Sequence, residues 1–155
     1  GVKTDSYTAT NTGPTDWKSP GLSVVITPTL NTSKILVMGY CVSGALAGYE
    51  NAVRWVRTIS GGSAVYLNIA DTSGSMTSAT SMMRINAGAR DANNASFMFL
   101  DAPATTTATT YHVEISVEAL ASDVYFNRTQ GESDTANDYR GSSSITVMEI
   151  AVGVL

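Results

Sequence analysis

The side chains with acid–base chemistry gather in one short stretch, Tyr111 to Glu118, with the sequence YHVEISVE. His112 is the only histidine in the chain, and Glu114 and Glu118 follow it on the same alternating face. At about 3.3 Å per residue, the backbones of Glu114 and Glu118 lie roughly 13 Å apart. The two carboxyls of a glycosidase lie about 5–9.5 Å apart. Because no glycine-flanked nucleophile motif accompanies the histidine, we interpret this stretch as a solvated strand face and predict that the chain is not an enzyme.

Hard oxygen ligands for a metal occur together in one loop, which contains Glu132, Asp134 and Asp138. Their spacing differs from that of an EF-hand calcium loop, and one histidine with one cysteine is too few for a transition-metal site. The loop is therefore interpreted as an acidic surface segment, and we expect no cofactor. Cys41 lies within an apolar run and is predicted to be a small buried core residue.

Recognition of a glycan or a protein by loops is the chemistry that remains open. Sugar sites combine an aromatic face with amide and carboxylate groups. The predicted loops carry such candidate receptor-binding groups at Tyr49, Glu50, Asn51, Arg90, Asp91, Asn93, Asn94, Asn137, Asp138, Tyr139 and Arg140. These residues form a receptor surface if the loops meet at one end of the fold, as binding loops on rigid scaffolds often do. For each residue alone, a plain solvated loop is the alternative.

Charge and length exclude several other functions. The net charge is −4 and no cluster of Lys or Arg is present, which disfavours binding to nucleic acid. The longest apolar run is shorter than the roughly 20 residues that span a bilayer, so no membrane insertion is expected. A length of 155 residues suits one domain, residues 1–155. Since the chain begins with glycine and not methionine, we expect it to be a fragment of a longer protein.

The elements that must position these residues are strands. No segment has a sustained helical period, and about 9–11 short alternating runs predict an all-β antiparallel sandwich or barrel. Val53 to Ile69 is predicted to be a hairpin around a glycine turn, and Ser96 to Leu100 a short buried strand. Gly44 to Ala52 and Asn86 to Asn94 are predicted loops. Trp17, in a Pro- and Gly-containing loop, is expected to plug the end of the sandwich.

The stretch from Ser142 to Leu155 is apolar on both faces at a period of two. Ser33 to Ser43 shares this property and is its expected partner at the centre of the fold. A strand of this kind is covered on both sides, so a second copy of the chain is the natural cover for the face away from the core. The interface candidates are Met148, Ile150, Val152 and Val154.

A set of segments along nearly the whole chain carries a resemblance to a known family. They are GLSVVITP (Gly21 to Pro28), SKILVMGY (Ser33 to Tyr40), RWVR, FLDAPATTTATTYHVEI (Phe99 to Ile115), VYFNRT (Val124 to Thr129) and SSSITVMEIA (Ser142 to Ala151). In this order and spacing the chain resembles the C-terminal head domains of bacteriophage tail-fibre and related virion fibre proteins, especially those of marine phages. The family has no catalytic motif, and its receptor-contacting residues vary.

The resemblance implies a jelly-roll-like β-sandwich that forms a homotrimer at the tip of a fibre. The implied partners are the rest of the fibre and virion, and a glycan or outer-membrane protein of the bacterial surface. The implied location is the virion, with assembly in the host cytoplasm. Two alternatives stay open: a purely structural decoration or scaffold module that binds no receptor, and a carbohydrate-active hydrolase.

Overall fold

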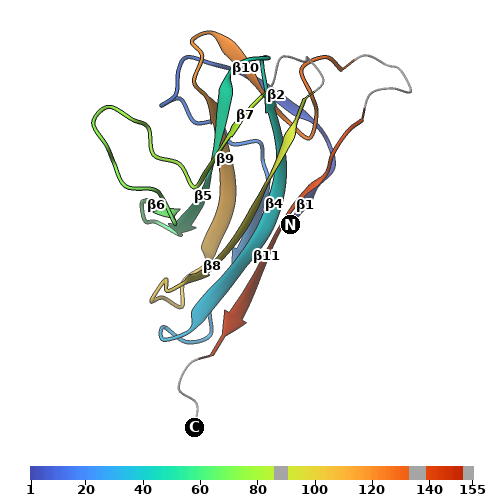
Figure 1. The fold of residues 1–155 in the computed structure, drawn as a ribbon. Helices are drawn as coiled ribbons and strands as arrows, with labels where there is room; N and C mark the ends of the chain where they lie inside the picture. Colours follow the sequence, from blue (N-terminus) through green and yellow to red (C-terminus); the bar gives the residue numbers. More distant parts are fainter. Residues whose placement is uncertain (86–90, 133–138, 152–155) are drawn as a thin grey trace.

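The computed structural model describes residues 1–85, 91–132 and 139–151. The described residues form eleven strands in two antiparallel sheets (Figure 1). In chain order the strands are β1 (Val2–Lys3), β2 (Tyr7–Asn11), β3 (Ser23–Ile26), β4 (Lys34–Ala45), β5 (Glu50–Ile59), β6 (Ala64–Leu67), β7 (Ser81–Arg84), β8 (Asn93–Asp101), β9 (Thr109–Val117), β10 (Ser122–Phe126) and β11 (Ser143–Ile150). No helix in this part of the chain has the length and apolarity to cross a membrane.

Strand β4 is the centre of the first sheet, which we call sheet A. One edge of β4 pairs with β8. The other edge pairs with β11 from Lys34 to Tyr40 and with β10 from Ser43 to Ala45. The short strands β1 and β2 complete the sheet by pairing with β11 and β10. The expected pairing of the terminal strand with Ser33 to Ser43 is confirmed, since seven residues of β11 face seven of β4 from Tyr40 to Lys34.

The second sheet, sheet B, is built around β5 and β9. Strand β3 pairs with the far edge of β9, while β6 and β7 share the far edge of β5. Along the chain, β2, β4 and β8 lie in sheet A, and the strands that follow each of them, β3, β5 and β9, lie in sheet B. This alternation between two antiparallel sheets is the jelly-roll arrangement, so the predicted fold class is confirmed for the protomer.

The core lies between the two sheets and is filled by the alternate side chains of each strand that point inward. Trp55 is its largest side chain and stacks on Phe97 with ring centroids 5.1 Å apart. The indole fits because β4 has a glycine opposite it: a Cβ on Gly39 would lie 2.6 Å from the Trp55 ring. Cys41 is fully buried, as predicted, and this burial raises the pKa of its thiol to about 12.

Two predicted loops are shorter than expected. Strand β4 runs on to Ala45 and β5 begins at Glu50, so the connection is a four-residue turn and not Gly44 to Ala52. Strand β8 likewise begins at Asn93, inside a segment predicted to be a loop. Strands β5 and β8 begin earlier than predicted because their first residues pair with neighbouring strands, for example Asn51 with Val117 and Asn93 with Ser43.

Two burial predictions are wrong. Trp17 does not plug the end of the sandwich but lies against Arg54 on the outer face of sheet B. The segment Ser96 to Leu100 is buried on one face only, since Met98 is 72% exposed and Leu100 is 52% exposed. Successive side chains of a strand point to opposite faces of the sheet, so Met98 and Leu100 lie on the outer face of sheet A, which is uncovered in the protomer.

Candidate functional site

The described parts of the loops that carry the receptor candidates meet at one end of the sandwich, which we call the loop end (Figure 1). The turn after β4 bonds to the end of β7, where Gly48 N donates to Ile85 O over 2.9 Å. It also contacts the loop after β10, where Ala47 N donates to Gln130 Oε1 over 3.4 Å. Asn93 Nδ2 joins this group by donating to Arg84 O. Among the described residues, the turn after β4, the end of β7, the start of β8 and the loop after β10 therefore lie side by side.

The individual candidates differ in their access to solvent at the loop end. Tyr139 is 84% exposed and Tyr49 is 37% exposed, so both offer an aromatic surface. Glu50 and Asp91 are half-buried, whereas Asn94 is exposed. Arg90, Asn137 and Asp138, together with Asp134 of the acidic loop, lie outside the described residues.

Asn51 and Glu132 have partners that change their interpretation. Asn51 points into the sandwich, is fully buried, and donates to Ser43 Oγ over 2.8 Å, which removes it from the candidate receptor contacts. Glu132 forms ion pairs with Arg128 and Arg140, so its carboxylate is shared between two guanidinium groups. The described residues hold no group of three or more metal-ligating side chains.

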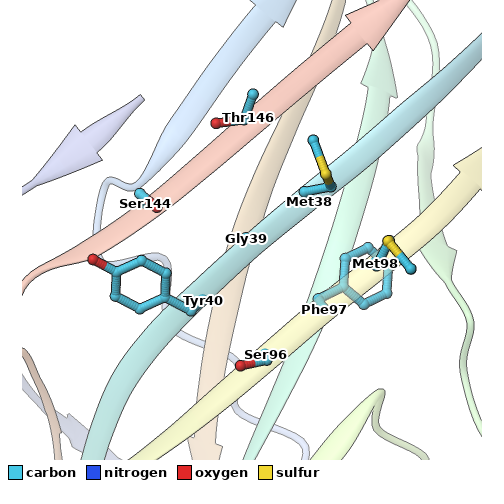
Figure 2. A pocket seen from close by; sticks show the side chains of 8 residues that line it. All are labelled: Met38, Gly39, Tyr40, Ser96, Phe97, Met98, Ser144 and Thr146. Atoms are coloured by element: carbon cyan, nitrogen blue, oxygen red, sulfur yellow. The ribbon is translucent and has the colours of Figure 1, made fainter.

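A second surface is the outer face of sheet A, which we call the uncharged face. Register places its side chains in three rows across β8, β4 and β11: Leu100, Leu36, Met148; then Met98, Met38, Thr146; then Ser96, Tyr40, Ser144. Figure 2 shows how the second and third rows line a shallow hollow of about 340 Å³. Ile150, which is 39% exposed, lies beyond the first row and pairs with Lys34, which marks the border of the uncharged face.

The strand β11 thus has the two faces that its sequence predicts. Ile145 is fully buried in the core, whereas Met148 on the opposite face is 53% exposed in the protomer. The interface candidates Met148 and Ile150 lie on the uncharged face, and Val152 and Val154 lie outside the described residues.

The acid–base stretch forms part of a third surface, on sheet B. His112 and Glu114 point to its outer face, as predicted, but each side chain is only 19% exposed, so the prediction of a solvated face is wrong here. His112 Nε2 is 3.4 Å from Glu114 Oε1. Glu114 accepts a 2.6 Å hydrogen bond from Arg54 Nε. The hydrogen bond from His112, with a further one from Arg54, lowers the pKa of Glu114. Ser116 shares the face but is buried, because its hydroxyl donates to Pro14 O in the loop that covers it.

Beside Glu114 lies a groove of about 540 Å³ that the sequence did not predict, which we call the Arg54 groove. Its floor is formed by Trp17, Arg54 and Tyr66, and its rim by the loop after β6. Finding it from sequence requires the pairing of β5 with both β6 and β9, because that register alone brings Arg54, Tyr66 and Glu114 together.

Comparisons with known families, curated proteins and solved structures give a weak structural likeness among the solved structures. No protein-family model matches the chain, and no curated protein matches it. A solved structure described as infectious bursal disease virus Gx strain is similar over 96% of this chain and 37% of that chain, with 15% identity and a TM-score of 0.40. This chain therefore spans little more than a third of the viral chain, and a likeness at this level carries no argument about function.

Proposed function

We propose that this chain is the head domain of a bacteriophage tail fibre, or of a related virion fibre, which attaches the particle to its host as a homotrimer. The observation that carries the proposal is the uncharged face of sheet A. Its nine side chains in three rows bear no charge, and Met98, Leu100 and Met148 are each more than half exposed. Fully burying such a side chain contributes about 1.5–3 kcal/mol.

A second copy of the same chain suits this face better than a charged partner does. Its nine side chains offer no charge for an ion pair, and a closed three-fold ring repeats one head-to-tail interface between each subunit and the next. The three-fold number comes from the resemblance to fibre heads, which also implies the virion as the location. Closed assembly would bury the apolar side chains that a lone protomer leaves in water.

Assembly through this face would also position the loop end for attachment. Strand β4 runs along the uncharged face and ends at Ala45, next to the loop end. Rotation about an axis roughly parallel to β4 therefore brings three loop ends to the same side of the trimer. Three weak sites on one rigid head, engaged together, raise avidity well above the affinity of one site.

The first test is solution mass by light scattering, with a matched pair of variants. The wild type is expected at three times the 16.2 kDa protomer mass. Met98→Glu places a charge on the uncharged face and should give monomers. Met82→Glu makes the same change at a methionine of sheet B that is 67% exposed, similar to the 72% of Met98, and should remain trimeric. Ile150→Asp should also be monomeric or insoluble.

The second test is attachment. Fluorescently labelled wild-type protein should bind cells of at least one strain in a panel of bacteria, and monomeric Met98→Glu should bind more weakly because avidity is lost. A folded trimer that labels no strain would instead favour the structural virion module. A monomeric wild type, or a Met98→Glu trimer, would overturn the assembly.

A further inference from the structure

Arg54, at the floor of the Arg54 groove, is held on three sides by its neighbours. Its guanidinium carbon lies 4.2 Å from the ring centroid of Trp17 and 4.0 Å from that of Tyr66. Its Nε donates to Glu114 over 2.6 Å. Only 15% of the side chain is exposed. Two cation–π contacts and one charge-assisted hydrogen bond therefore fix the orientation of this guanidinium before any ligand binds.

The outer face of sheet B beneath this stack is shielded from solvent to the same extent as the core between the sheets. Val56 points to the outer face of sheet B, between Tyr66 and His112 in the register, and yet it is fully buried. It lies outside the main core cluster between the sheets. The stack of Trp17, Arg54 and Tyr66 thus forms a packed layer of its own on the outside of sheet B.

Arg54 nevertheless keeps donors for a ligand. Among the described residues, Nη1 and Nη2 donate to no partner, and the one hydrogen bond of the side chain is donated by Nε. A guanidinium carries five N–H donors in a planar fork that matches a carboxylate in bidentate geometry. Glu114 already balances the charge of Arg54, which favours a singly charged carboxylate over a doubly charged phosphate.

The rim of the groove supplies polar and apolar contacts. Thr72, Ser75 and Thr77 contribute hydroxyls, and Met76, 73% exposed, contributes an apolar side chain. The loop is closed at its base, where Ala70 N donates to Ala79 O and Thr80 Oγ1 donates to Leu67 O. Hydroxyls beside an aromatic ring that is 47% exposed, that of Tyr66, suit the hydroxyls and C–H faces of a sugar.

We propose that the Arg54 groove binds a saccharide that carries a carboxylate, such as a uronic acid. The carboxylate pairs with the Arg54 fork, the ring packs against Tyr66 and Met76, and the ring hydroxyls meet the loop. A volume of about 540 Å³ lies within the roughly 300–1,000 Å³ of small-molecule sites. The idea that this saccharide is part of the host receptor rests on the proposed function, whereas the binding itself does not.

The binding test uses the full chain and a panel of oligosaccharides, with tetragalacturonate as the acidic probe and maltotetraose as its neutral match. Trp17 lies in the groove and Trp55 is buried in the core, so a ligand is expected to change the fluorescence of Trp17. Tetragalacturonate or another uronic-acid oligosaccharide should give a saturable change, and maltotetraose should not. Equal binding of the neutral sugar, or no binding across the acidic panel, would overturn the proposal.

Two variants distinguish binding by the planar guanidinium of Arg54 from binding by its positive charge alone. Arg54→Lys keeps the positive charge but loses the planar fork, and should weaken acidic-saccharide binding at least tenfold. Arg84→Lys makes the same change at an arginine whose side chain is 64% exposed, and should leave binding unchanged. Unaltered affinity in a folded Arg54→Lys protein contradicts the site. Saccharide binding without cell labelling would reject the proposed function alone, and cell labelling without saccharide binding would reject the groove alone.

Discussion

Gly39→Ala tests how closely the core tryptophan approaches strand β4. A Cβ at this position would lie 2.6 Å from Trp55 Cη2 and 2.7 Å from the backbone oxygen of Ser144. Overpacking of this kind costs about 1–3 kcal/mol, and the better strand behaviour of alanine offsets about 0.5–1 kcal/mol of it. The difference between these two figures is about 0–2.5 kcal/mol. Because the contact with Ser144 is with backbone, which cannot swing aside, the low end is excluded, and we expect a net loss of about 1–2 kcal/mol of unfolding free energy.

Urea unfolding followed by circular dichroism measures this loss, at one fixed protein concentration because assembly contributes to stability. With a slope of about 2 kcal/mol per molar urea, the midpoint should fall by about 0.5–1 M. Ser23→Ala, at an exposed position of strand β3 in sheet B and outside the uncharged face, should change the free energy by less than about 0.5 kcal/mol.

A double-mutant cycle identifies the cause. Trp55→Phe shortens the side chain that Gly39→Ala would strike, so the two changes together should cost less than their sum by at least about 0.5 kcal/mol. The remaining cost reflects the contact with Ser144, which phenylalanine does not relieve. Strict additivity, or a Gly39→Ala protein as stable as the wild type, would refute the packing argument.

Two further predictions concern charged groups. Asp101 is 5% exposed, accepts two hydrogen bonds from Arg57 and one from Tyr111, and its replacement by Asn should cost about 3 kcal/mol or more in urea unfolding; the matched Asp5→Asn change, at an exposed ion pair, should barely move the midpoint. Glu114 has its pKa lowered from 4.5 by His112 and Arg54, so its contribution to stability is complete above pH 4.5 and is lost as the pH falls through its folded-state pKa. The urea midpoint of Glu114→Gln should therefore fall less between pH 5 and pH 3 than that of the wild type, and equal slopes would contradict the ion-pair argument.

Much of the fold is predictable from alternation in the sequence. The hairpin of β5 and β6, the central β4 and its pairing with β11 all follow from apolar periodicity and a glycine turn. The run from Ser96 to Leu100 is misleading, because four consecutive apolar residues do not reveal that Met98 and Leu100 lie on a sheet face without a cover in the protomer.

The candidate sites are less predictable than the strands. From the sequence, Asn51 is predicted to be a polar loop residue. Only the pairing of β5 with β7 and β9 shows that its side chain points into the interior. The Arg54 groove joins residues from four segments, and the contact of Trp17 with Arg54 depends on how the loop before β3 folds back onto sheet B. Such contacts depend on tertiary register, which periodicity along the chain does not encode.

The pairing of β4 with β11 has a consequence for biosynthesis. Strand β4 ends at Ala45 and β11 begins at Ser143, and at about 5–20 residues per second a ribosome needs roughly 5–20 s to make the chain between them. During that interval one edge of β4 lacks the strand that later covers most of it, and β1 has no partner among the described strands. Sheet A can therefore close only after β11 has emerged, so the nascent chain exposes an open apolar edge that a chaperone could protect.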